Sequence, residues 1–78
     1  MATYRMTRYL PTGQVKEWPS YFKSQAEAAR RAGQCLLDNG AASKAEAQRF
    51  SAALAKASLS VIVDHEPSGY SFMIVRGW

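Results

Sequence analysis

Residues 24–57 read SQAEAARRAGQCLLDNGAASKAEAQRFSAALAKA, and this stretch decides the fold because it holds two helix signals in succession. Ser24 and Ser43 each stand three residues before a glutamate, which is the spacing of a capping box at a helix start. Alanine and leucine follow both serines at helical intervals, and Asn39-Gly40 is typical of a helix end. We therefore expect one helix from Ser24 to Asn39 and a second from Ser43 to about Ala57.

Two turns of similar composition flank the helical stretch, Pro11-Thr12-Gly13 before it and Pro67-Ser68-Gly69 after it. Proline presets the first turn position and glycine permits the left-handed backbone, a combination that favours a three-residue hairpin loop. The segments around these turns alternate or are rich in β-branched residues, as strands are. We expect strands at residues 3–10, 14–18, 59–66 and 70–78. The order is ββααββ: one α+β domain, residues 1–78, with a four-stranded, mainly antiparallel sheet and both helices on one face.

The composition narrows the class of protein. Of 78 residues, 47% are hydrophobic and 21% charged, the balance of a globular domain. With one cysteine and one histidine, a single chain cannot build a disulfide framework or a zinc site of several Cys and His ligands. The sequence shows no leader peptide and no apolar run of the roughly 20 residues that cross a membrane. We expect a cytoplasmic protein without a metal, a cofactor or a membrane partner.

Few residues are candidates for catalysis. Asp64-His65-Glu66 is the only cluster that mixes a histidine with carboxylates, and neighbours on a strand point to opposite faces. We therefore expect His65 to lie at a solvated strand end without a catalytic or metal-binding role. Cys35 lies among apolar residues of the first helix, where we expect a buried structural thiol. The protein is predicted not to be an enzyme, and no residue is predicted to be catalytic.

The last hairpin offers a candidate partner surface. A three-residue loop would place Glu66 opposite Tyr70, so that Val61, Val63, Met73 and Val75 face the helices. The opposite, exposed face would then hold an apolar and aromatic set of partner-binding candidates: Tyr70, Phe72, Ile74, Arg76 and Trp78. A loop of different length would instead turn Tyr70, Phe72 and Ile74 into the core. Both registers remain open at this point.

The basic residues offer a second candidate surface. The net charge is +4, which either keeps a small domain soluble or assists approach to nucleic acid or an acidic protein. Lys23, Arg30 and Arg31 are predicted to share a flank of the first helix, where Glu27 could pair with Arg31. The partner-binding candidates on the second helix are Arg49 and Lys56.

In size, basic character and its plan of hairpin, helices and hairpin, the chain resembles small phage-encoded anti-CRISPR proteins, especially inhibitors of multisubunit type I effector complexes. The resemblance covers the architecture of the whole chain and no diagnostic residues. It implies a non-enzymatic protein that binds a nucleoprotein complex in a bacterial host cell, as a monomer or homodimer, and blocks its DNA binding or its conformational change. The alternative is a small basic nucleic-acid-binding or transcription-regulatory module, and the third hypothesis is a structural subunit of a homo-oligomer.

Overall fold

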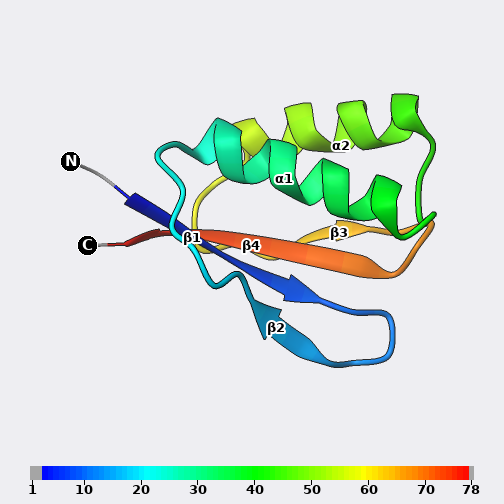
Figure 1. Cartoon of the computed structure of the whole chain (residues 1–78), viewed down its shortest axis with the longest axis horizontal. Coiled ribbons are helices and arrows are strands. Elements are labelled where there is room, and N and C mark those ends of the chain that lie inside the picture. Colours follow the sequence, from blue (N-terminus) through cyan, green and yellow to red (C-terminus); the bar gives the residue numbers. More distant parts are fainter. Residues whose placement is uncertain (1–2, 78) are drawn as a thin grey trace.

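A computed structural model describes residues 3–77 of the chain as a four-stranded antiparallel sheet covered by two helices. The elements, in chain order, are β1 (Thr3–Tyr9), β2 (Val15–Glu17), α1 (Gln25–Asp38), α2 (Lys44–Lys56), β3 (Val63–His65) and β4 (Tyr70–Gly77). The strand order is β2-β1-β4-β3, so the long strands β1 and β4 form the centre of the sheet. Both helices lie on one face (Figure 1). The predicted ββααββ order and α+β class are confirmed.

The two helices begin at the predicted serines. Ser24 Oγ accepts a hydrogen bond from the Glu27 backbone N–H at 3.1 Å, and Ser43 Oγ accepts one from the Glu46 backbone N–H at 3.2 Å. Each bond satisfies a donor that the first helical turn leaves free. The predicted stop of α1 is also confirmed, since Asn39 is its C-cap and Gly40 follows with φ of +65°.

The helices pack closely at a glycine. Ser51 Oγ donates a hydrogen bond across the interface to the Ala29 carbonyl oxygen at 2.8 Å. A Cβ atom placed on Gly33 would lie 2.1 Å from Ser51 Oγ and 2.9 Å from the Ala47 carbonyl oxygen. A glycine inside α1 costs helix stability, and here the cost is offset by the close approach of α2.

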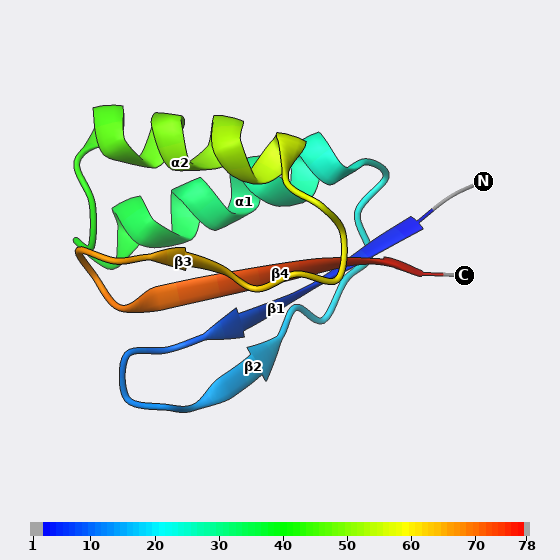
Figure 2. The same cartoon turned by 180° about the vertical axis from the view of Figure 1, so that it is seen from behind.

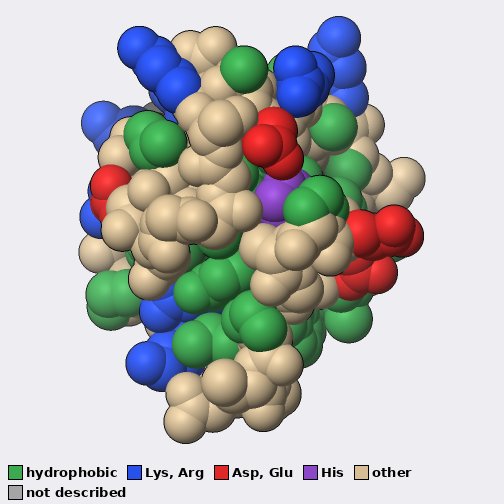
Figure 3. Space-filling model, turned by 90° about the vertical axis from the view of Figure 1, so that its right-hand side faces the viewer, with side chains coloured by type: hydrophobic (Ala, Val, Ile, Leu, Met, Phe, Trp, Pro, Cys, Tyr) green, Lys and Arg blue, Asp and Glu red, His purple; other side chains and the backbone are tan. Residues whose placement is uncertain are grey.

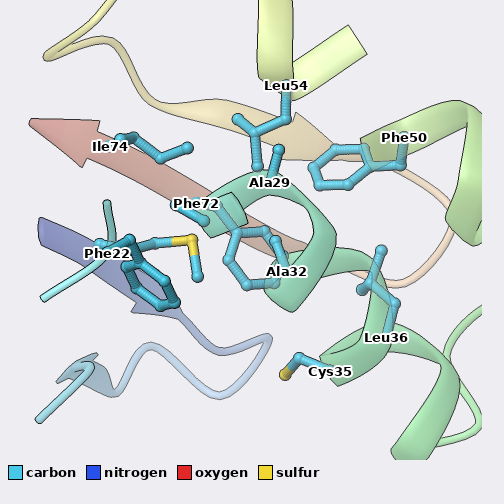
Figure 4. Close-up of a cluster of buried hydrophobic side chains, with 11 residues drawn as sticks. Phe22, Ala29, Ala32, Cys35, Leu36, Phe50, Leu54, Phe72 and Ile74 are labelled. Carbon is cyan, nitrogen blue, oxygen red and sulfur yellow. The ribbon is translucent and has the colours of Figure 1, made fainter. Parts of the chain in front are cut away.

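The core lies between the helices and the sheet (Figure 4), where β4 and both helices direct apolar side chains toward one another. The largest fully buried side chains are Met6, Leu36, Leu54 and Phe72. Phe72 is the centre of an aromatic group, with its ring centroid 5.6 Å from that of Phe50 and 6.3 Å from that of Trp18. The core therefore joins β4 to α2 and to the residue that follows β2.

The first hairpin has the predicted loop. The Leu10 N–H donates to the Gln14 carbonyl oxygen at 2.8 Å, and the Gly13 N–H donates to the Leu10 carbonyl oxygen at 2.9 Å. Gly13 takes the left-handed backbone expected of it, with φ of +94°. Strand β2 is shorter than predicted, although the Trp18 N–H still donates to the Met6 carbonyl oxygen at 3.0 Å.

The register predicted for the last hairpin is wrong. His65, not Glu66, stands opposite Tyr70, so the loop has four residues. The Ser68 and Gly69 N–H groups both donate to the His65 carbonyl oxygen, at 3.2 and 3.0 Å. Strand β3 also begins later than residue 59, because Ser60 has a φ of +64° and turns the chain.

This one-residue difference exchanges the two faces of β4. Phe72 and Ile74 are 0% and 2% exposed and belong to the core. Met73 and Val75, predicted to face the helices, alternate with them and lie on the uncovered face of the sheet. The alternative register is the correct one for these β4 residues, whereas Val61 stays 50% exposed outside the strand. A slip of one residue reverses every side chain of a strand.

Candidate functional site

A groove of about 480 Å³ runs between α1 and α2 on the outer side of the helical layer. The α1 residues that line it, 26, 30, 33, 34 and 37, share the side of the helix that faces away from the sheet and toward α2. The full lining is Ala26, Arg30, Gly33, Gln34, Leu37, Lys44, Ala47, Gln48, Ser51, Ala52 and Ala55. Most of these residues are small, so the surface between the helices is hollow.

The floor of the groove follows from the same close packing that joins the helices. Gly33 of α1 meets Ala47 and Ser51 of α2, and none of the three has a side chain long enough to fill the space above. On α2, Ala47, Ser51 and Ala55 recur every fourth residue and therefore lie on one face of the helix. The groove thus results from small residues that face one another on α1 and α2. Its shape is maintained by the packing of the two helices.

Both charged residues that line the groove are cations. Among residues 3–77, Arg30 and Lys44 are the charged residues that line it. Leu37 supplies an apolar side chain that is 37% exposed, and the Gln34 amide is hydrogen-bonded to Asp38 Oδ1 at 2.7 Å. Figure 3 shows Lys and Arg side chains at the top of the molecule, where the helices lie. The groove therefore combines an apolar floor with a cationic rim.

The basic residues predicted near the first helix differ in their surroundings. Arg30 lines the groove, and Arg30 and Arg31 together line a second, shallower hollow beside Tyr21 and Glu27. Lys23 is exposed, precedes α1 and lines neither hollow. The expected Glu27–Arg31 pair is wrong, because the one ion pair within residues 3–77 is Arg5–Glu17.

The other predicted basic candidates lie apart from the groove lining. Arg49 and Lys56 are exposed and share a side of α2, being two turns apart, but they lie outside the residues that line the groove. Arg76 is exposed near the end of β4, opposite Tyr4. These three cations add positive charge to the surface without forming a hollow with Arg30.

The predicted aromatic surface is not available for a partner. Phe72 and Ile74 are buried, and the Tyr70 ring stacks on Phe72 with a centroid separation of 6.4 Å. The physical reason is the four-residue loop, which turns these side chains toward the helices. Trp78, the last member of the set, lies outside the described residues.

His65 and Cys35 are both buried. His65 was expected at a solvated strand end, but it is 7% exposed, and its ring packs edge-on against Phe50 at a centroid distance of 5.3 Å. His65 Nδ1 lies 2.7 Å from Ser68 Oγ, which satisfies that ring nitrogen. The buried thiol predicted for Cys35 is confirmed by its 6% exposure. Within residues 3–77, no three His, Cys, Asp or Glu side chains gather as metal ligands.

Lys44 and Leu37 line the groove and were not predicted as site residues. A signal for them was present, since Ala47, Ser51 and Ala55 mark a small-residue face on α2 and Gly33 marks the place where α1 meets it. Small residues at this spacing let two helices approach closely. The pattern indicates a close helix pair, but the outer groove emerges only when both helices are placed together.

Comparison with protein-family models, with curated proteins and with solved structures gave no match to this chain. Neither α1 nor α2 has the length and apolar character needed to span a bilayer.

Proposed function

We propose that the chain is a non-enzymatic binding protein whose α1/α2 groove receives an acidic amphipathic helix of a protein partner. The observation that carries the proposal is the pairing of a largely apolar groove of about 480 Å³ with the two cations that line it, Arg30 and Lys44. An amphipathic helix binds a groove by placing its apolar side chains on the floor, while its charged side chains meet the rim. The sign of the rim selects an acidic partner.

The small residues of the groove allow close approach of another helix. Interaxial distances between packed helices are about 8–10 Å and are shortest where the contact residues are small. The floor residues Gly33, Ala47 and Ser51 meet this condition, and Leu37 stands at one end as an apolar contact. Arg30 and Lys44 lie on opposite helices, so that carboxylates on both sides of the bound helix would each find a cation.

We infer further that the partner belongs to a multisubunit nucleoprotein complex and that binding inhibits it, as the anti-CRISPR likeness of the architecture implies. A charged cleft attracts a partner surface of the opposite sign, so the partner of this groove is an acidic surface of the complex. A small basic domain that binds such an acidic helix in its groove can hold the complex in one conformation. It needs no catalytic activity to do so. This role places the chain in the cytoplasm of a bacterial host.

A purified type I effector complex with its target duplex supplies the test. DNA binding is measured by gel shift at a fixed complex concentration while the chain is added. The proposal predicts that DNA binding falls as the chain is added and that the chain comigrates with the complex. A complex that binds DNA equally well at all concentrations of the chain would rule out the inhibitory role.

The nucleic-acid-binding alternative has the net charge of +4 in its favour. It predicts that the chain alone binds bare duplex or single strands, with an affinity that falls steeply as salt is raised because counterions are released. Binding to the protein complex should change less with salt, since its centre is apolar. A titration of the chain against target duplex at two salt concentrations separates the two functions.

A further inference from the structure

A second positively charged site lies on the first hairpin, away from the α1/α2 groove. Arg8 of β1 and Lys16 of β2 are directly opposite each other in the ladder, so their side chains project from the same face of the sheet. That face is the one that carries buried Met6, because residues 6 and 8 of β1 alternate with 5 and 7. Like charges in this position destabilise a sheet, so the pair calls for an explanation.

No carboxylate of the hairpin neutralises the pair. Glu17 is the one acidic residue between positions 3 and 23, and its neighbour Lys16 points to the opposite face. Glu17 instead accepts a hydrogen bond from Arg5 on the uncovered face, with the two charged groups 3.2 Å apart. Within residues 3–77, neither Arg8 nor Lys16 has a carboxylate within ion-pair distance.

The Arg8 guanidinium is only partly satisfied by the chain. Its NH1 group donates to Cys35 Sγ at 3.2 Å, and thiol sulfur is a weak acceptor. Its central carbon lies 5.0 Å from the Trp18 ring centroid, which fixes the plane of the group. Its Nε is buried and has no hydrogen-bond partner among the described residues. Arg8 is therefore held in place by weak contacts, with donor capacity that nothing in residues 3–77 uses.

We propose that Arg8 and Lys16 bind a phosphate group. Side chains directly opposite on one face have Cβ atoms about 4.5–5.5 Å apart, close enough for both cations to reach one small anion. A phosphate monoester carries about −1.5 to −2 charges at neutral pH, which matches two cations, whereas one carboxylate would neutralise a single cation. The guanidinium can donate a charge-assisted hydrogen bond to a phosphate oxygen, and the lysine adds a point charge.

The exposed member of the pair, Lys16, lies at the edge of the sheet. Strand β2 forms an edge of the sheet, and in Figures 1 and 2 it lies farther from the helices than β1 and β4 do. Lys16 is exposed, while Arg8 is partly buried beneath Trp18. The pair thus combines an exposed ammonium with a guanidinium that contacts Trp18 and Cys35.

The experiment measures thermal unfolding and ¹H–¹⁵N NMR spectra of the full chain with added inorganic phosphate, at an ionic strength held constant with sodium chloride. The proposal predicts saturable shifts of the Arg8 Nε–H and the Lys16 amide, and a rise in Tm with phosphate because the ligand binds the folded state. Lys16→Glu should raise Tm without phosphate, because it turns a like-charge pair into an opposite-charge pair, and should abolish the phosphate-dependent rise.

Lys23→Glu is the matched control, since it makes the same charge change at an exposed residue outside both hollows. It should keep the phosphate response of the wild-type chain. The proposed site would be overturned if phosphate raised the Tm of the wild-type and Lys16→Glu chains equally. It would also be overturned if Lys16→Glu and Lys23→Glu lost the phosphate-dependent rise to the same extent. A parallel titration with oligothymidylate identifies the source of the phosphate: tighter binding of inorganic phosphate indicates a terminal phosphate, and tighter binding of the strand indicates a nucleic-acid backbone.

Discussion

His65 lies directly opposite Tyr70 at the end of the last hairpin, and the Ser68 hydroxyl oxygen lies 2.7 Å from His65 Nδ1. The same hydroxyl accepts a hydrogen bond from the Tyr70 N–H at 3.2 Å. Ser68 thus ties both ends of a four-residue loop, and the loop sets which face of β4 meets the helices. The first predictions follow from this register.

Phe72→Ala should strongly destabilise the fold. Phe72 is fully buried at the centre of the aromatic group, and removal of a buried phenylalanine costs about 3–5 kcal/mol. Its neighbour Met73 lies on the uncovered face of the sheet, so Met73→Ala should cost much less. Urea denaturation measures both variants. A Phe72→Ala chain as stable as wild type would instead support the register in which Glu66 lies opposite Tyr70 and Phe72 is exposed.

His65→Ala should weaken the fold even though His65 was expected to be solvated. The substitution removes the edge-on contact with Phe50 and the bond to Ser68, both in buried surroundings. We expect a loss on the order of 2 kcal/mol in the free energy of unfolding. Ser58→Ala, at an exposed position, is the control and should be nearly neutral. A neutral His65→Ala variant would contradict the packing role of the ring.

Ser24→Ala and Ser43→Ala should each cost about 1 kcal/mol, because each removes the acceptor of a first-turn N–H group. Circular dichroism during thermal unfolding measures the loss, again with Ser58→Ala as the control. Because the two caps belong to different helices and do not touch, the losses should add in the double variant. Wild-type stability in both single variants would place the helix starts elsewhere.

Gly33→Ala should destabilise the chain by about 1–3 kcal/mol through overpacking against Ser51 and the Ala47 carbonyl group. Helix propensity alone predicts the opposite sign, since alanine favours a helix interior over glycine by about 1 kcal/mol. The sign of the change in unfolding free energy therefore shows whether overpacking against α2 or helix propensity has the larger effect. A more stable Gly33→Ala chain would show that α1 and α2 are not held this closely.

The helices and the first hairpin were predictable because their signals are local. Ser24, Ser43 and Gly13 each act within a few residues, through a cap or a left-handed backbone. The last hairpin was not predictable in the same way. Pro67-Ser68-Gly69 resembles the first turn, but the bonds from Ser68 to the His65 ring and to Tyr70 add one residue to the loop.

The α1/α2 groove was beyond prediction for a different reason. Arg30 was identified by its charge, but Lys44 and Leu37 enter the groove only because α2 packs against Gly33. This contact joins residues far apart in sequence, and one sequence does not reveal which faces of two helices meet. The charge pattern therefore singled out Arg30, while the place of Arg30 in a groove depended on tertiary packing.

The most direct test of the proposed function is the concentration of the chain that halves DNA binding by the type I effector complex, compared between Lys44→Glu and Lys23→Glu. Both variants make the same charge change, and a glutamate at the start of α2 favours the helix, so the fold should be kept. The proposal predicts that Lys44→Glu raises this concentration at least about tenfold, equivalent to about 1.4 kcal/mol, while Lys23→Glu leaves it unchanged. Equal half-inhibition by the two variants and the wild-type chain would contradict the groove as the partner site.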